Sequence, residues 1–104
     1  MRILHDHDGL AIRLTSERID HIADHLEMRS MRDAIGETVL HPQHVVQSLS
    51  DPEARLYYRY HSGTLVGDKL LCVVVGVTAE DAFVLTAYLT DRIKRGVYLW
   101  PGRK

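Results

Sequence analysis

The chain has 104 residues, 45% of them hydrophobic, and a formal net charge of −1 at pH 7. This length suits one domain, residues 1–104, and the hydrophobic content excludes a disordered tail. No apolar run is long enough to cross a bilayer and the N-terminus lacks the apolar segment of a signal peptide, so we expect no membrane contact. The near-neutral charge excludes a global attraction to nucleic acid, so such a partner requires a local basic patch.

The chain contains a single cysteine and seven histidines. Cys72 lies in the most apolar run, so we expect a small buried side chain, no disulfide and a reducing, cytoplasmic location. The histidine count is high for this length. It indicates a metal site, acid–base chemistry or no special role, depending on where each histidine lies.

The N-terminal part predicts one short strand. Residues 1–9 contain His5 and His7, and we expect a flexible, solvated segment there in preference to a weak metal-binding tract. The next residues, 10–14, alternate between apolar and other side chains, which predicts a strand.

Two helices are predicted after this strand. The first covers residues 16–26, with hydroxyl side chains at its start and an apolar stripe at helical spacing. That stripe consists of Ile19, Ile22, Ala23 and Leu26. The second helix starts near Ser30, which has capping-box spacing to Asp33, and it ends at His41 because a proline follows.

The remaining chain predicts strands, and its centre is a hairpin. Residues 69–77 are almost entirely apolar, as in a central strand that is buried on both faces. A short polar break separates this run from residues 82–88, which alternate. The alternation places Thr86 and Tyr88 on one face of the sheet together with Val84.

Further strands are predicted around Val45, over residues 54–61 and over residues 97–100. Helices that are segregated from consecutive strands indicate an α+β domain. We therefore expect two N-terminal helices packed on one face of a mainly antiparallel sheet of about four to five strands. The other face of the sheet is then available for a functional site.

His21 and His25 are the first candidates for chemistry. Their spacing places them one turn apart on the predicted helix, roughly opposite its apolar stripe. Two histidines at this spacing can bind zinc, but the segment lacks the glutamate of a zinc protease and no cysteine pair completes a site. Metal binding is therefore the least favoured interpretation, after exposed histidines without a role and general acid–base catalysts.

The other candidates come from the strands and the last connection. Arg59 lies between tyrosines in a strand, where it either forms an ion pair or binds phosphate. Thr86 offers a hydroxyl on a neighbouring strand. Lys94 with Arg92 and Arg95 forms a cationic cluster that is either solvated surface or the local positive patch.

In combination, these residue types match phosphoryl transfer without a metal. In RNA cleavage the 2′-hydroxyl attacks the adjacent phosphate, a base and an acid move protons, and cations stabilise the extra charge on phosphorus. DNA lacks this nucleophile, so such a site acts on RNA.

Short motifs are spread over nearly the whole chain. They are Glu17-Arg-Ile-Asp-His21-Ile-Ala-Asp-His25, Tyr57-Tyr58-Arg59, Val73-Val74-Val75, Thr86-Ala87-Tyr88 and Lys94…Gly96…Leu99-Trp100. These motifs resemble those of the phage-associated barnase/EndoU/colicin/RelE-like nuclease domains. The resemblance implies two helices followed by a four-stranded antiparallel sheet, and a metal-independent RNA endonuclease that serves as a toxin.

The resemblance also implies roles for individual residues. The catalytic set is His21, His25, Arg59, Thr86 and Lys94. Substrate-binding residues are expected beside it, namely Tyr57, Tyr88, Arg92 and Arg95. Either histidine serves as base or acid, the arginine and the lysine stabilise the charged phosphate, and the threonine hydroxyl binds it. No metal and no cofactor is expected.

The chain departs from the family in two ways. Leu26 stands where members often have proline, and the chain lacks the strongly basic charge of toxins that attack the ribosome. The second departure favours a free RNA such as tRNA as the partner, or a lost activity. The resemblance itself implies a cognate antitoxin or immunity protein as a further partner. Two alternatives stay open: an inactive nuclease-like module that binds a protein or RNA, and a metal-binding protein that uses the N-terminal histidines with His21 and His25.

Overall fold

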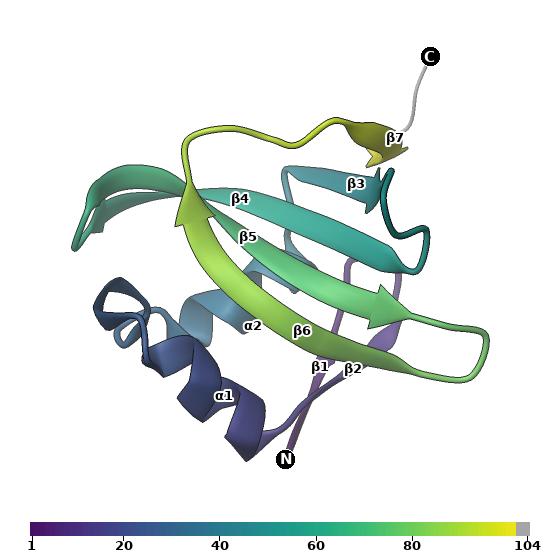
Figure 1. Cartoon of the computed structure of the whole chain (residues 1–104), viewed down its shortest axis with the longest axis horizontal. Helices are drawn as coiled ribbons and strands as arrows, with labels where there is room; N and C mark the ends of the chain where they lie inside the picture. Colours follow the sequence, from purple (N-terminus) through teal and green to yellow (C-terminus); the bar gives the residue numbers. More distant parts are fainter. Residues whose placement is uncertain (102–104) are drawn as a thin grey trace.

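The computed structural model describes residues 1–101. In this range the chain forms two α-helices, a short 3₁₀ helix and seven strands of one sheet (Figure 1). The elements are β1 Arg2–His5, β2 Ala11–Leu14, α1 Ser16–Ala23, η1 Leu26–Met28, α2 Arg32–Leu40, β3 His44–Ser48, β4 Ala54–Thr64, β5 Gly67–Val77, β6 Ala82–Thr90 and β7 Gly96–Trp100. Within the described residues, neither helix has the length and hydropathy of a membrane-spanning segment.

The strand order across the sheet is β1-β2-β6-β5-β4-β3-β7. All neighbouring pairs are antiparallel except β2 and β6, which run parallel. The α+β class is therefore confirmed, but the expected arrangement is wrong in two respects. The sheet has seven strands, and the helices lie between β2 and β3 instead of at the N-terminus.

The N-terminal residues form a strand and a turn, in contrast to the expected flexible segment. β1 pairs with β2 at the edge of the sheet, and the buried Asp6 organises the turn between them. Its Oδ1 accepts hydrogen bonds from the backbone N–H groups of Asp8 and Leu10, both at 2.9 Å. A side chain that satisfies nearby backbone donors in this way stabilises a tight turn.

The first helix begins as predicted and ends early. The Thr15 side chain caps α1 by accepting the N–H of Arg18 at 3.1 Å. The helix ends at Ala23, and His25 has an extended backbone with φ −82° and ψ 117°. Leu26 was expected in the apolar stripe, but it lies in η1 and is 60% exposed. The chain turns out of the helix here, so helical periodicity no longer decides which side chains are buried.

The start of the second helix differs from the prediction, whereas its end agrees with it. α2 begins after Met31 without a side-chain cap, so the capping box predicted for Ser30 is wrong. Its end is as predicted, because Leu40 is the last helical residue and His41 follows as the cap. The residue before a proline resists the helical conformation, and this purely local effect is visible in the sequence.

The sheet has an apolar cluster on each face. Ile22 of α1 and Ile35 of α2 belong to the larger cluster, together with Leu71, Val73 and Val75 of β5. The opposite face carries a smaller cluster of Val46, Leu56, Tyr58 and Cys72. β5 contributes to both clusters and lies in the middle of the strand order, which confirms the prediction of a central strand.

A β-bulge decides which side chains of β6 face which way. The register between β5 and β6 shifts between Val74, which pairs with Thr86, and Val75, which pairs with Val84. Val84 therefore joins the cluster under the helices, whereas Thr86 and Tyr88 face the opposite side. The expectation that Val84 shares a face with Thr86 is wrong, because the extra residue of a bulge reverses the alternation.

Candidate functional site

The face of the sheet opposite α1 and α2, which we call the open face, carries a pocket of about 490 Å³. Its floor is apolar and consists of Val46, Ala54, Leu56, Val74 and Leu85. Its polar lining consists of Ser48, Ser50, Asp51, Thr86, Tyr88, Lys94 and Arg95. One wall is the connection between β3 and β4, and the other is the connection that crosses the sheet from β6 to β7 (Figure 1).

A row of polar and sulfur-containing side chains crosses the open face, and Tyr88 at one end of the row lines the pocket. The strand register aligns His44, Tyr58, Cys72 and Tyr88 on four neighbouring strands. Burial raises the pKa of Tyr58 to about 12, although the hydrogen bond from the N–H of Lys94 opposes the change. Burial likewise raises the pKa of Cys72 to about 11, against hydrogen bonds with Tyr88 and Tyr58. The phenols and the thiol are therefore uncharged at neutral pH.

The connection between β6 and β7 is held to the sheet at two points, of which the first lies on the open face. The backbone N–H of Lys94 donates to the Tyr58 hydroxyl at 3.1 Å. Asp91 forms an ion pair with Lys69 of β5 at 2.7 Å. The Nζ of Lys94 lies 6.0 Å from the centre of the Tyr88 ring, within reach of a cation–π interaction. These contacts fix the position of the lysine beside the pocket.

The charged groups of the pocket are Lys94, Arg95 and Asp51. Two cations and one carboxylate make the pocket positive, although the whole chain has a formal charge of −1. On the other wall, the hydroxyl oxygens of Ser48 and Ser50 lie 3.1 Å apart. Ammonium, guanidinium and hydroxyl groups all donate to phosphate oxygens, and an apolar floor accepts a flat ring such as a nucleobase.

Comparisons of the chain with models of known protein families, with curated proteins and with solved structures find no match. Membership of the barnase/EndoU/colicin/RelE-like superfamily is therefore still a prediction from sequence motifs. We infer the function from the chemistry of the site itself.

Four of the predicted site residues meet in the pocket, namely Thr86, Tyr88, Lys94 and Arg95. They come from one strand and the connection that follows it, so they are also close in sequence. The structure brings together the hydroxyl, the aromatic ring and the cations of the predicted set. It does not bring the remaining predicted residues to the same place.

The two helix histidines lie away from this pocket. His21 is exposed on α1, which packs against the other face of the sheet. His25 is also exposed, and it follows the end of that helix. The expected stacking of the two imidazoles on one helical turn is therefore not formed, and the sheet separates both from Lys94.

Arg59 and Arg92 are also outside the pocket. Arg59 lies on the helix-covered face, where its Nη1 donates to the backbone carbonyl of His41 at 2.8 Å. A cation at the C-terminal end of α2 interacts favourably with the helix dipole. Arg92 is exposed in the β6–β7 connection and does not line the pocket.

Tyr57 was expected to bind substrate, but it is fully buried under the helices. Its hydroxyl donates to Oδ2 of Asp6 at 2.7 Å, and Nη1 of Arg55 lies 3.9 Å from the same oxygen. The tyrosine therefore satisfies a buried carboxylate that holds the N-terminal turn.

Replacing Tyr57 by phenylalanine is expected to lower the free energy of unfolding by about 1–3 kcal/mol, because it removes a hydrogen bond from a buried carboxylate. Urea denaturation followed by circular dichroism measures this change. Tyr60→Phe on the same strand is the control, since Tyr60 is exposed and an exposed change costs at most about 0.5 kcal/mol. If the Tyr57→Phe variant is instead as stable as the wild type but binds RNA more weakly, Tyr57 belongs to the binding site.

His61 gives the fold a pH dependence. Burial lowers its pKa below the usual 6.5, and the nearby Glu37 opposes this change. The folded state therefore binds fewer protons than the unfolded state, and stability falls as the pH drops below about 6.5. We expect His61→Gln to flatten the stability profile between pH 7.5 and about pH 5 in urea titrations. His21→Gln, which changes an exposed imidazole, should leave the profile as in the wild type.

The sequence did not predict the pocket wall that lies opposite Lys94 and Arg95. Ser48, Ser50 and Asp51 were given no role by the sequence analysis, and nothing in their spacing indicated a pocket. His44 was also missed, and it lies two residues before Val46 and forms a hydrogen bond with the Tyr98 hydroxyl. The signal was the alternation of β3, which places this histidine on the open face.

The N-terminal and helix histidines do not gather into one site. Among residues 1–101, no three histidine, cysteine, aspartate or glutamate side chains lie together as a metal site would require. His7 instead packs on Trp100, with ring centres 4.8 Å apart. The described residues thus give the metal-binding alternative no ligand set.

Proposed function

We propose that this chain is a nuclease-like protein that binds single-stranded RNA in the open-face pocket. One observation carries the proposal: two cations, several hydroxyl groups and an apolar floor line a single pocket on an uncovered sheet face. Lys94 and Arg95 bind backbone phosphate, and the apolar floor accepts one unstacked base.

The preference for single-stranded RNA follows from the dimensions and the chemistry of the pocket. A volume of about 490 Å³ lies in the range of sites that enclose a small molecule. Only an unstacked base can enter such a site, because the bases of a duplex are paired and stacked. The net charge of the chain supplies no general attraction, so binding depends on the local cations and weakens with salt.

Fluorescence anisotropy tests this binding. A labelled single-stranded RNA of mixed sequence should bind more tightly than the same RNA annealed to its complement. Its association constant should fall with salt, with a slope of about −0.7 for each phosphate contacted. Equal affinity for the duplex, or binding independent of salt, would contradict the proposal.

The second candidate is a metal-independent endoribonuclease of the toxin type, acting on RNA such as tRNA and controlled by an antitoxin or immunity protein. Asp51 favours it, because this carboxylate lies in the same pocket as the cations. Its Oδ1 accepts the N–H of Glu53 at 3.1 Å, and its Oδ2 has no hydrogen-bond partner among the described residues. A carboxylate so placed can accept a proton.

In this candidate reaction, Asp51 accepts the proton of the 2′-hydroxyl, whose oxygen then attacks phosphorus. Lys94 and Arg95 stabilise the added negative charge, and Thr86 donates a hydrogen bond to a phosphate oxygen. The 5′-oxygen leaves with a proton from an acid, a role that we assign to His44, the imidazole on the open face outside the pocket lining. The products are a 2′,3′-cyclic phosphate and a free 5′-hydroxyl. His21 and His25 have no part in it, since they lie on the far side of the sheet.

A cleavage assay separates the two candidates. Total RNA and tRNA are incubated with the protein in excess chelator, and the new ends are analysed for cyclic phosphate. Cleavage that is lost in Asp51→Asn and in His44→Gln, but kept in a His21→Ala/His25→Ala variant, supports the ribonuclease. Binding without cleavage of any RNA supports the first candidate, an RNA-binding module without nuclease activity. Cells should then tolerate overexpression of the intact chain.

A further inference from the structure

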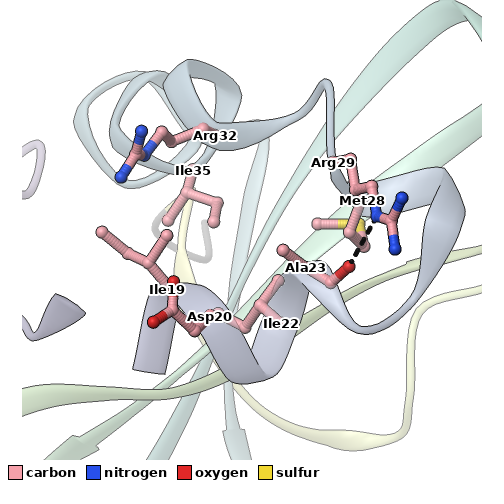
Figure 2. Close-up of a pocket in the computed structure, with 8 residues that line it drawn as sticks. All are labelled: Ile19, Asp20, Ile22, Ala23, Met28, Arg29, Arg32 and Ile35. Carbon is pink, nitrogen blue, oxygen red and sulfur yellow. Dashed lines mark hydrogen bonds between the residues drawn. The ribbon is translucent and has the colours of Figure 1, made fainter. Parts of the chain in front are cut away.

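A second pocket lies on the other side of the molecule, between the helices. Its volume is about 220 Å³, and its walls come from α1, η1 and α2 (Figure 2). Ile19, Ile22, Ala23, Met28 and Ile35 provide an apolar lining. The view shows Ile19 and Ala23 of α1 facing Ile35 of α2, with Arg29 and Arg32 at opposite ends.

This space exists because α1 ends early. Helical periodicity assigns Leu26 to the stripe that faces α2, but the chain leaves the helix at Ala23. Leu26 is 60% exposed, so its side chain does not fill the space between the helices. Protein interiors are normally packed without voids of this size, and an unfilled apolar space that opens to solvent is suited to a ligand.

The rim of this pocket is cationic. The Nε of Arg29 donates to the carbonyl of Ala23 at 3.2 Å, which directs the guanidinium across the end of α1. Neither Arg29 nor Arg32 forms an ion pair with an acidic side chain among the described residues. Asp20 also lines the pocket, but the two guanidinium groups outnumber this one carboxylate.

We propose that the helix pocket binds a small amphiphile with an apolar chain or ring and a carboxylate head. A dry cavity of about 150 Å³ suffices for benzene, so 220 Å³ admits a chain of about six to eight carbons. The apolar body displaces water from the isoleucines, and the carboxylate pairs with a guanidinium at the rim. This site is separate from the open-face pocket and does not depend on RNA binding.

The probes are octanoate, octanol and octylamine, which share a chain and differ in the charge of the head. They are titrated into ¹⁵N-labelled full chain, and amide shifts are followed by NMR. We expect octanoate to shift the amides of Ile22 and Ile35 with a millimolar Kd, as for a ligand of its size. Octanol should bind about tenfold more weakly, and octylamine more weakly still.

Two variants locate the site. Ala23→Phe fills the pocket from its half-buried edge and should abolish the shifts at Ile22 and Ile35. The double variant Arg29→Gln/Arg32→Gln should keep binding of octanol and remove the preference for octanoate. Circular dichroism melting confirms that each variant is folded, and Ala23→Leu is used in place of Ala23→Phe if the phenylalanine variant does not fold.

Three outcomes would overturn the proposal. They are an affinity for octanoate no higher than that for octanol, tightest binding by octylamine because Asp20 dominates, and shifts that persist when Ala23 is enlarged. The first two would remove the carboxylate as the head group, and the third would place binding elsewhere on the molecule.

Discussion

Replacing Lys94 and Arg95 together by alanine is expected to weaken binding of single-stranded RNA by about 100-fold or more. Both side chains line the open-face pocket, and they supply its positive charge. A hydrogen bond to a charged group is worth about 1.5–3 kcal/mol, and about 1.4 kcal/mol corresponds to a factor of ten in affinity. The salt slope should become shallower by about 1.4, which is the value for two lost phosphate contacts on a single strand. Anisotropy titrations at several salt concentrations measure both quantities.

Arg92→Ala is the matched control for this double variant. It removes a cation from the same connection, but from a residue that does not line the pocket. The backbone hydrogen bond from Lys94 to Tyr58 does not involve the lysine side chain, so the connection should keep its place in the variant. If Arg92→Ala weakens binding as much as the double variant, the general charge of the connection binds RNA and the pocket has no special role.

Gly96→Ala is expected to lower the free energy of unfolding by about 1–3 kcal/mol or more. Gly96 starts β7, which pairs with β3 at the edge of the sheet. A Cβ atom at this position would overlap the backbone carbonyl oxygen of Gln47 and Cγ1 of Val46. The obstacle is partly backbone, so the strands must separate, and forced overpacking of this kind costs about 1–3 kcal/mol or more. Denaturant unfolding of the variant gives the value directly.

Gly36→Ala in α2 is the control for this glycine substitution. A Cβ atom there would meet only Leu4 at 3.4 Å and Arg2 at 3.9 Å, which are ordinary contact distances. Alanine in the middle of a helix is favoured over glycine by about 0.5–1 kcal/mol, so we expect this variant to be stabilised. The prediction for Gly96 fails if its variant is as stable as the wild type. A stable variant would mean that β7 can move away from β3 without cost.

The sequence by itself determined the local elements of this protein. The apolar run of β5, the turn after it and the strand β6 depend on neighbouring residues, and all three are present in the structure, although a bulge reverses the alternation within β6. Proline after His41 ended α2 for the same local reason. Thr86, Tyr88, Lys94 and Arg95 are the predicted residues that do share a pocket, because they lie within one hairpin strand and its following connection and few long-range contacts had to be known.

The tertiary structure decided which of these elements share a face. His21 and Lys94 looked like one catalytic set, yet the sheet lies between them, and only the packing of α1 determines this. Ser48 and Asp51 line the pocket because β3 pairs with β4 and because the β6–β7 connection crosses the open face of the sheet. No short-range sequence pattern encodes these two contacts. Periodicity reports one element at a time, whereas a site is made where several elements meet, and that meeting depends on contacts between residues far apart in the chain.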